Sequence, residues 1–312
     1  MLLFALVGCG STEANGTDPE DAGAPQPDGA ATGPGASPDE PYVYERTLPR
    51  LTTGGSHTCG LKADGSAACW GSNGAQQAEP PSGEFKQLAA GNNTTCGLRP
   101  DGSVVCWGFD SVGETKPPAA TFVQIAASNE RFACGVKVDG LVECWGAHRT
   151  ARQGNVPPPP GKFHEISAGG WHVCGIQEDG SVACWGANDS GQSTAPPGKF
   201  LHVAAGVANT CGLKLDGSVV CWGQESADGP PPAGKFVQLA AGPWHTCGLK
   251  SDRTVSCWGD NVLGQATAPA GAYHEVSAGN MRAWAIKMDG TVAFWGKKQD
   301  DNEIAPNATF WP

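Results

Sequence analysis

The chain has 312 residues and a formal net charge of −11, with 45 Gly, 25 Pro and only 3 Met. This composition is typical of many short strands joined by tight turns and argues against a helical protein. Seven acidic residues and no basic ones lie between residues 10 and 41, so the rest of the chain, with 20 basic and 24 acidic residues, has a net charge of only −4. Because no basic stripe is present that could neutralise phosphates, we expect no nucleic-acid partner.

The chain begins with an apolar run that ends in Leu6-Val7-Gly8-Cys9. This ending resembles the lipobox of bacterial lipoproteins, whose signal peptide is removed so that the cysteine becomes the lipidated first residue. The resemblance implies a lipid anchor on Cys9 as the only membrane attachment, because a transmembrane helix needs about 20 apolar residues. It also implies a location in the bacterial cell envelope, either periplasmic or surface-exposed. The run departs from the usual signal peptide in that no Lys or Arg precedes it.

Residues 10–41 are rich in Gly, Ala, Pro and acidic residues. Such a segment cannot bury a core, and its composition predicts a disordered tether. We therefore expect three parts: a signal peptide with its lipobox at residues 1–9, an acidic tether at 10–41, and a folded domain at 42–312.

From about Pro41 onward the sequence repeats itself. Seven Trp-Gly pairs mark the units, with spacings of 37, 38, 40, 37, 36 and 37 residues: Trp70-Gly71, Trp107-Gly108, Trp145-Gly146, Trp185-Gly186, Trp222-Gly223, Trp258-Gly259 and Trp295-Gly296. The units carry strand signals and no helical periodicity, so repeat classes built on helices are set aside. Seven short units with Pro-rich links indicate a closed ring of sheets, in which the tryptophans pack between neighbouring sheets.

A tight hairpin is predicted in each unit by an Asp-Gly dipeptide, because Gly accepts the positive φ that such a turn requires. Six units carry it: Asp64-Gly65, Asp101-Gly102, Asp139-Gly140, Asp179-Gly180, Asp216-Gly217 and Asp289-Gly290. In the sixth unit along the chain Arg253 replaces the glycine. We expect that turn to be looser or differently shaped.

Of the 13 cysteines, all but Cys9 form pairs across these hairpins. A three-residue turn with Gly in the left-handed conformation places Cys59 opposite Cys69, at a non-hydrogen-bonded position whose Cα separation of about 4.5 Å suits a disulfide. The same register predicts six disulfides: Cys59-Cys69, Cys96-Cys106, Cys134-Cys144, Cys174-Cys184, Cys211-Cys221 and Cys247-Cys257. Zinc explains the pairs less well, because its ligand pairs prefer two to four intervening residues. In the seventh unit Trp284 and Phe294 occupy the cysteine positions, and we expect an aromatic cross-strand pair there.

The units, for example AAGNNTTCGLRPDGSVVCWG and SAGGWHVCGIQEDGSVACWGANDSGQ, resemble repeats of the regulator-of-chromosome-condensation type (RCC1-like repeats). The resemblance covers about Thr47 to Trp295. It implies an all-β fold, a seven-bladed β-propeller of four-stranded antiparallel blades. The activity of eukaryotic members on nucleosomes and a small GTPase is not carried over, because this chain is mildly acidic and its links are short and even.

A recognition surface is predicted from the alternation of strand direction, which places the loop before the second strand and the loop after Trp-Gly on one face. The residues in these loops vary between units while the strands and turns stay nearly constant, as expected of a binding face on a scaffold. The predicted face contains Asn93, Arg131, Phe132, Trp171, His172, Trp244, His245, Met281, Arg282, Phe109, His148 and Asn188. We expect a monomer whose face binds a protein or peptide partner.

Three histidines, His57, His172 and His245, stand at the same repeat position in the first, fourth and sixth units. They are too far apart around a ring for one metal site, so we expect them to hold loops by hydrogen bonding. We expect no metal and no cofactor. His202, like other histidines near the first strand of its unit, is predicted to be an ordinary surface residue.

Two other functions remain open at this stage. One is an enzyme acting on cell-wall or extracellular polymer with acids such as Asp110, Asp189 and Glu225, although no nucleophile or metalloprotease motif is present and we expect no enzyme. The other is a purely structural envelope protein. Two closures of the ring are also open: the segment around Phe310 starts an eighth unit that pairs with the first, or residues 42–47 supply the closing strand.

Overall fold

The structure of the chain is a computed structural model that describes residues 48–146, 157–224, 230–298 and 305–310. The chain divides into two units, Met1–Tyr44 and Glu45–Pro312, and all described residues lie in the second. The predicted lipidation site Cys9, the tether and the predicted contact residue His148 lie outside the described residues. Within the described ranges no helix has the length and apolar character needed to cross a membrane.

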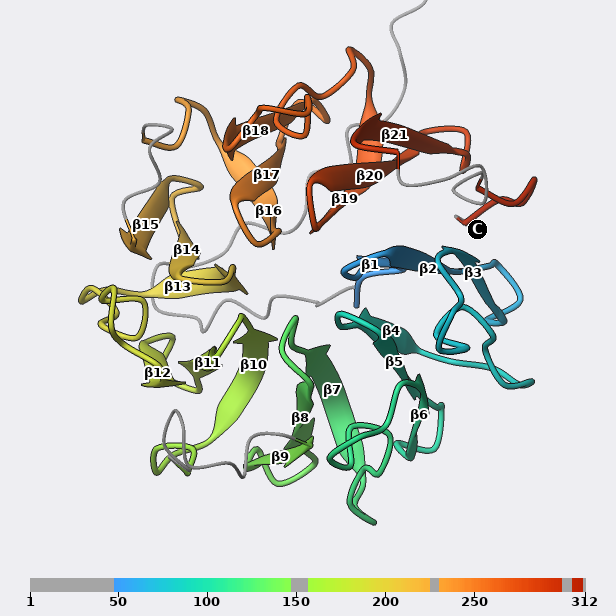
Figure 1. Cartoon of the computed structure of the whole chain (residues 1–312). Helices are drawn as coiled ribbons and strands as arrows, with labels where there is room; N and C mark the ends of the chain where they lie inside the picture. Colours follow the sequence, from blue (N-terminus) through green and yellow to red (C-terminus); the bar gives the residue numbers. More distant parts are fainter. Residues whose placement is uncertain (1–47, 147–156, 225–229, 299–304, 311–312) are drawn as a thin grey trace, which may run out of the picture. The chain divides into compact units, whose positions relative to one another are not determined.

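The described residues form seven antiparallel sheets of three strands each (Figure 1). The strands are β1 (Leu51–Thr53), β2 (His57–Leu61), β3 (Ala67–Gly71), β4 (Gln87–Ala90), β5 (Thr94–Leu98), β6 (Val104–Gly108), β7 (Phe122–Ala127), β8 (Phe132–Lys137), β9 (Val142–Gly146), β10 (Phe163–Ala168), β11 (His172–Gln177), β12 (Val182–Gly186), β13 (Phe200–Ala205), β14 (Asn209–Lys214), β15 (Val219–Gly223), β16 (Phe236–Ala241), β17 (His245–Lys250), β18 (Val255–Gly259), β19 (Tyr273–Gly279), β20 (Arg282–Lys287) and β21 (Val292–Gly296).

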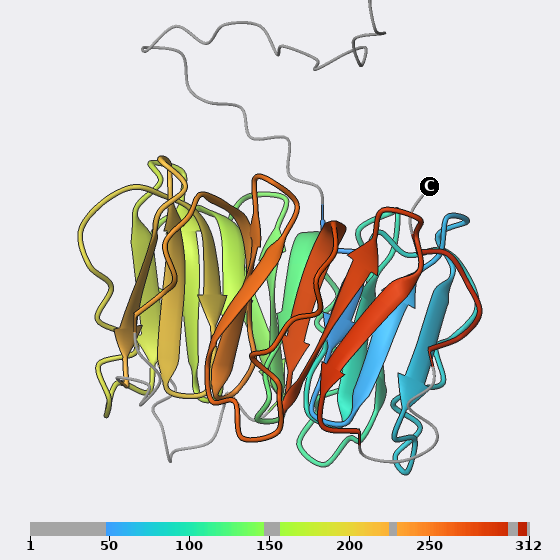
Figure 2. The same ribbon diagram turned by 90° about the horizontal axis from the view of Figure 1, so that it is seen from above.

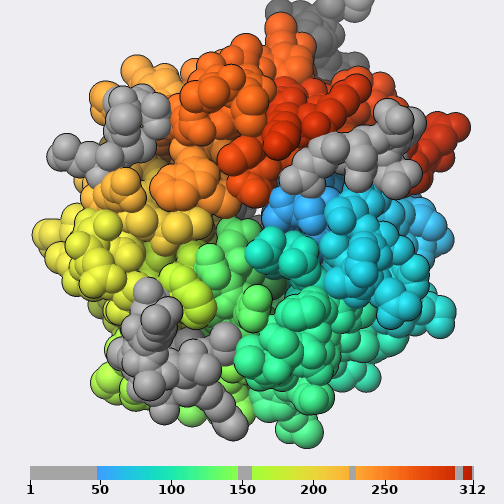
Figure 3. Space-filling model, viewed as in Figure 1, coloured from blue at the N-terminus to red at the C-terminus, as the bar shows by residue number. Residues whose placement is uncertain are grey.

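The sheets stand around a central axis, and we number them as blades 1 to 7 in chain order. In every blade the first strand is innermost and the third is outermost (Figure 1). The strands run from one face of the ring to the other (Figure 2). In the space-filling view, neighbouring blades touch around a narrow centre (Figure 3). Since both faces of each blade are covered by neighbours, the core lies between the blades.

Each blade has three strands in the described residues, where the sequence predicts four. The segment after Trp-Gly, which would form a fourth strand, contains Pro80-Pro81 in blade 1 and Pro117-Pro118 in blade 2. Proline has no N–H to donate to a neighbouring strand, so successive prolines disfavour a continuous hydrogen-bonded ladder in these links. Only an isolated bridge between Ser66 and Glu84 pairs the first link with its blade.

The predicted hairpin register is present in every blade. Cys59 lies opposite Cys69, and all six predicted disulfides are formed, with Cα–Cα distances of 4.0 Å. In blade 7, Trp284 lies opposite Phe294 with ring centroids 4.8 Å apart, as predicted.

The expectation of a looser turn at Arg253 is wrong. Arg253 takes the left-handed conformation, φ 69°, and its N–H donates to the Lys250 carbonyl at 2.9 Å. Gly65 makes the same bond to Lys62 at 3.0 Å with φ 77°. The paired strands on either side hold the turn closed, so the arginine accepts a conformation that it rarely adopts.

An aromatic ring packs on a glycine at the contact between successive blades. A β-carbon added to Gly97 would come within 2.5 Å of the Phe85 ring, whose centroid lies 6.0 Å from that of Trp107. The glycine in the repeated Thr-Cys-Gly-Leu sequence therefore leaves room for the aromatic ring. Equivalent aromatic pairs, Phe122–Trp145, Phe163–Trp185, Phe200–Trp222 and Phe236–Trp258, recur in blades 3 to 6.

The innermost strands are also joined through one repeated side-chain position. Gln87 of blade 2 donates from Nε2 to the Ile125 carbonyl at 2.8 Å and accepts the Ile125 N–H at 2.9 Å. His202 occupies this position in blade 5, where Nε2 donates to the Leu239 carbonyl at 2.8 Å and Nδ1 lies 2.6 Å from Glu165 Oε1. The prediction that His202 is an ordinary surface residue is therefore wrong. It links blades 4, 5 and 6.

The ring closes where blade 7 meets blade 1. The backbone N–H groups of Arg50 and Leu51 donate to the two carboxylate oxygens of Glu275 at 2.9 and 2.7 Å. Phe310 is fully buried beside Trp70 of blade 1, as the first of the two predicted closures requires. Residues 42–47, the alternative, lie outside the described residues.

Candidate functional site

Two sets of loops lie on one face of the ring, as the sequence predicts. The N–H of Phe109, directly after the Trp-Gly of blade 2, donates to the carbonyl of Asn93 in the loop before the second strand, at 2.9 Å. The same bond joins Asp260 to Trp244 in blade 6 at 2.8 Å. We call this face the loop face. The Asp-Gly turns lie at the other end of each hairpin, on the turn face.

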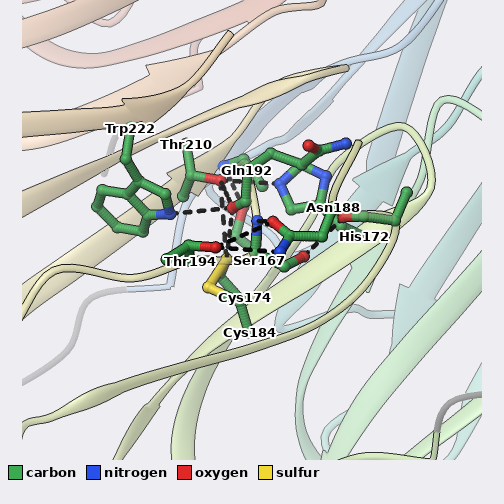
Figure 4. Close-up of a disulfide and its surroundings, with 12 residues drawn as sticks. Ser167, His172, Cys174, Cys184, Asn188, Gln192, Thr194, Thr210 and Trp222 are labelled. Carbon is green, nitrogen blue, oxygen red and sulfur yellow. Dashed lines mark hydrogen bonds between the residues drawn. A yellow bond between two sulfur atoms is a disulfide. The ribbon is translucent and has the colours of Figure 1, made fainter. Parts of the chain in front are cut away.

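A buried polar residue anchors each of four loops on the loop face: Gln77, Glu114, Gln192 and Gln265. Figure 4 shows the anchor of blade 4. Gln192 Oε1 accepts the Ser190 N–H at 2.9 Å, while its backbone carbonyl accepts the Thr210 hydroxyl at 3.1 Å and the Trp222 indole N–H at 2.9 Å. Each such loop is thus closed by a hydrogen bond within the loop and joined by hydrogen bonds to the next blade.

These four buried residues were not predicted, although the sequence contains a signal for them. In all four units the anchor stands seven positions after the tryptophan, and in three it follows a glycine: Gly113-Glu114, Gly191-Gln192 and Gly264-Gln265. A Gln in an exposed loop normally indicates solvent contact. Its burial here depends on the indole and hydroxyl donors of the next blade, which only the folded ring brings together.

The accessible members of the predicted face come mainly from blades 2, 3 and 6. Trp244 is 47% exposed and Phe109 is 40% exposed. Asn93, Arg131 and Asn188 are exposed, and Trp171 and Met281 are partly buried. The Asn188 side chain also shapes its own loop, since Oδ1 accepts the Ser193 N–H at 2.9 Å.

Four other predicted contact residues lie beneath the loop face. Phe132, His172, His245 and Arg282 are at most 4% exposed. Each of them directly follows one of the more accessible residues Arg131, Trp171, Trp244 and Met281. Because successive side chains of a strand point to opposite sides, these four side chains point inward. We assign them mainly to the support of the loop face, although Phe132 also lines a cleft described below.

Two of the three repeated histidines hold neighbouring blades together through threonine, whereas neither ring nitrogen of His245 has a hydrogen-bond partner among the described residues. His172 Nε2 lies 2.8 Å from Thr210 Oγ1 (Figure 4), and His57 Nε2 lies 2.6 Å from Thr95 Oγ1. Because each threonine hydroxyl donates to a loop carbonyl, that of Gln192 or Gln77, the imidazole must be the donor. Burial lowers the pKa of His172 to about 4, and burial together with the Arg282 charge lowers the pKa of His57 to about 3. Both rings are neutral at pH 7.

No metal site is found in the part of the chain that the structure describes, where no group of three or more His, Cys, Asp or Glu residues is placed to hold an ion.

Blade 3 differs from the other blades by one inserted residue in the loop before its second strand. Nine positions separate Ile125 from Cys134, whereas eight separate the equivalent Leu88 and Cys96 of blade 2. In blade 2 the loop is closed by a hydrogen bond from the Gly91 N–H to the Thr94 carbonyl. In blade 3 the corresponding hydrogen bond runs from the Ser128 N–H to the Phe132 carbonyl and spans one more residue. In this loop Arg131 takes the left-handed conformation, with φ 67°.

A cleft of about 50 Å³ lies beside this loop, between blades 2 and 3. Four of the predicted contact residues, Asn93, Phe109, Arg131 and Phe132, line it together with Thr94, Ser128 and Glu114. The Arg131 guanidinium lies over the Phe109 ring, 5.5 Å from its centroid. The cleft is therefore a small recess of mixed polar and apolar lining, with a cation over an aromatic ring at its edge, and it is our candidate binding site.

Comparison with protein-family models identifies the repeat. The model described as "Regulator of chromosome condensation (RCC1) repeat" matches residues 51–77, 85–114, 163–192, 200–228 and 236–265. The protein is an RCC1-like repeat β-propeller. The matched segments fall in blades 1, 2, 4, 5 and 6. Blade 3 carries the inserted residue, and blade 7 carries the aromatic pair in place of a disulfide.

Solved structures agree with the assignment of an RCC1-like propeller. The CRINKLY WD40 ectodomain of the Arabidopsis thaliana receptor kinase ACR4 is 28% identical with a TM-score of 0.70, covering 80% of this chain and 95% of that one. The entire ectodomain of the Physcomitrella patens receptor kinase CR4 is 26% identical with a TM-score of 0.68, covering 79% and 72%. Human WBSCR16, at 16% identity and a TM-score of 0.60 over 75% and 85% of the two chains, shares the fold. Comparison with curated proteins finds no match.

Proposed function

We propose that this RCC1-like propeller is an exported binding scaffold whose loop face recognises a protein or peptide partner, and that a lipid on Cys9 holds it to a membrane. The six disulfides indicate an oxidising, extracytoplasmic environment. Leu6-Val7-Gly8-Cys9 supplies the sequence that lipidation would use. The two similar receptor-kinase structures are ectodomains, which supports a propeller working outside the cytoplasm.

The observation that carries the proposal is the exposure of large side chains on anchored loops. Trp244 is 47% exposed, and its loop neighbours Val262 and Leu263 are 86% and 42% exposed. Leu263 lies in a loop held by Gln265, whose Oε1 accepts its N–H at 2.9 Å. Tryptophan and arginine are enriched among the residues that carry binding energy, and a preorganised loop loses little entropy when it binds. We therefore propose that Trp244 on blade 6 and Arg131 on blade 3 contribute most of the binding energy.

The test compares Trp244→Ala with Leu215→Ala. Leu215 is 57% exposed on the turn face and provides a matched apolar control. Each purified variant is immobilised and exposed to extracellular and envelope proteins of the source cells, and captured proteins are quantified by mass spectrometry. We expect a captured partner to fall at least ~10-fold with Trp244→Ala and to be unchanged with Leu215→Ala.

Equal capture by both variants would contradict the proposal. If Arg131→Ala also captured as much partner as Leu215→Ala, a structural role for the propeller would be the better explanation. The lipid anchor is tested separately, by the mass of the mature N-terminal peptide of the wild-type chain and of Cys9→Ser. An unmodified cysteine in the wild type rules out the anchor without affecting the loop-face proposal.

A further inference from the structure

We infer that the cleft between blades 2 and 3 binds a carboxylate side chain, so that the partner segment recognised there is an acidic peptide. The inference rests on the proposed function, because it names the chemistry of one part of the loop face. It depends on Arg131, on the acids around it, and on the size of the cleft.

Arg131 contacts an aromatic ring while its hydrogen-bond donors stay free. Its backbone is left-handed and its guanidinium stacks on Phe109 at 5.5 Å. Within the described residues, its side chain makes no hydrogen bond or ion pair, whereas the guanidinium groups of Arg50 and Arg99 donate to backbone carbonyls. A guanidinium plane stacked on an aromatic ring keeps its N–H edge available, and that edge matches a carboxylate with two parallel hydrogen bonds.

The acids near the cleft are already engaged. Asp110 pairs with Lys116 at 3.3 Å and accepts the Gly113 N–H at 2.8 Å. Glu114, which is 2% exposed, accepts the N–H groups of its own loop at Ser111 and Val112, at 2.8 and 2.7 Å. Asp110 and Glu114 therefore have partners of their own.

Glu130 is the remaining acid beside Arg131. Burial raises the pKa of its carboxyl above the usual value, although the Arg131 charge acts in the opposite direction. Within the described residues Glu130 forms no ion pair with Arg131, so it does not occupy the guanidinium. The inserted loop presents one cation to the cleft, and a negative group on the partner complements it.

The size of the cleft limits what can enter. A water molecule needs roughly 10–15 Å³ of such space, so about 50 Å³ admits a group of a few non-hydrogen atoms. A carboxylate with its methylene fits, whereas an aromatic side chain does not. The lining of the cleft combines polar Thr94 and Ser128 with the apolar side chains of Phe109, Phe132 and Ala133.

The experiment uses a random dodecapeptide library displayed on phage and selected against the full-length protein. Enriched peptides are resynthesised with amidated C-termini, so that only side-chain carboxylates remain. Binding is then measured to the wild type, Arg131→Gln, Arg131→Lys, Trp244→Ala and Arg253→Gln. Arg253 is the matched control, because it is an exposed arginine with φ 69° on the turn face.

We expect the enriched peptides to share an Asp or Glu, with binding at least ~10-fold weaker to Arg131→Gln, intermediate for Arg131→Lys, and unchanged for Arg253→Gln. Replacing the shared acid of the peptide by its amide should weaken binding to the wild type by the same factor and leave binding to Arg131→Gln unchanged. Peptides that lack an acid, or that bind Arg131→Gln as well as the wild type but fail to bind Trp244→Ala, would overturn the carboxylate inference and leave loop-face recognition standing. Enriched peptides insensitive to both Arg131 and Trp244 would overturn both.

Discussion

The ring of Phe310 lies on the backbone of Gly60, so close that a β-carbon on the glycine would come within 2.5 Å of it. Phe85 and Gly97 have the same relationship, also at 2.5 Å, between blades 1 and 2. The Phe310 N–H donates to the Gly290 carbonyl in the turn of blade 7 at 3.0 Å, as that of Phe85 donates to Gly65 at 2.9 Å. A C-terminal residue thus fills, in blade 1, the position that a link residue fills in blade 2, and the ring is closed by side-chain packing.

Phe310→Ala should therefore open the closure. The side chain is fully buried, and large-to-small changes of a buried Phe cost about 3–5 kcal/mol of unfolding free energy. Urea denaturation followed by tryptophan fluorescence measures the loss, and the exposed neighbour Thr309→Ala serves as control. An unfolding free energy within about 0.5 kcal/mol of the wild type for both variants would show that Phe310 does not close the ring.

The inner rim on the loop face should not tolerate a side chain at Gly169. A β-carbon there would come within 2.2 Å of the Gly206 carbonyl in the next blade, and Gly54 stands in the same relation to Gly91 at 2.1 Å. Gly169→Ala should cost at least ~2 kcal/mol, because a blade must move to relieve the clash. Gly74→Ala is the matched control, with no atom within 4 Å of the added carbon, and should be neutral or slightly stabilising. Equal unfolding midpoints in urea for the two variants would contradict this packing.

Features that depend on short-range spacing could be predicted from the sequence. The disulfide between Cys59 and Cys69 follows from turn length and strand alternation alone. The four-stranded blade was wrong because family resemblance supplied it, whereas links such as that of blade 1, with Pro80 and Pro81, disfavour an outer strand.

Features that depend on the neighbouring blade could not be predicted. The side chain of His172 is buried because Thr210, 38 positions along the chain, accepts its hydrogen bond, and nothing local to the histidine indicates this. The cleft beside Arg131 is an intermediate case. The inserted residue is visible in the spacing, but the stacking of Arg131 on Phe109 requires the contact between two blades.

Removing one disulfide should weaken the fold without abolishing it. The bond between Cys174 and Cys184 joins residues 10 apart in sequence, and a loop of that size contributes about 2–3 kcal/mol by restricting the unfolded chain. The double variant Cys174→Ala with Cys184→Ala should lose about that amount in urea denaturation under non-reducing conditions. Full reduction of the wild type should destabilise it further, since five other bridges remain in the double variant. A midpoint unchanged from that of the wild type would mean that strand pairing alone sets the stability of this hairpin.

His172 should make the protein less stable in mild acid. Burial lowers its pKa to about 4, from an ordinary value of 6.5 that the unfolded chain regains. Between these values the unfolded state binds more protons, so stability is fully present above pH 6.5 and falls as pH drops towards 4, by up to ~3 kcal/mol for this group. His172→Gln, which keeps a donor for Thr210, should lose less stability than the wild type over this range. Parallel stability–pH curves for the two proteins would refute a neutral buried histidine.

Glu275, at the junction of blades 7 and 1, should have the opposite effect on the pH dependence of stability. Burial raises the pKa of its carboxyl to about 7 from 4.5, and this outweighs the N–H donors of Arg50 and Leu51, which favour the charged form. Between pH 4.5 and 7 the folded state binds more protons than the unfolded state, so the contribution of Glu275 is largest at low pH and falls as pH rises, by up to ~3 kcal/mol. Glu275→Gln places at the closure the residue type found at this position as Gln87, Gln124 and Gln238, and it removes the titration. Relative to the wild type, the variant should gain stability between pH 4.5 and 7 in urea denaturation. A constant difference across that range would show that the two N–H donors keep Glu275 charged in the folded ring.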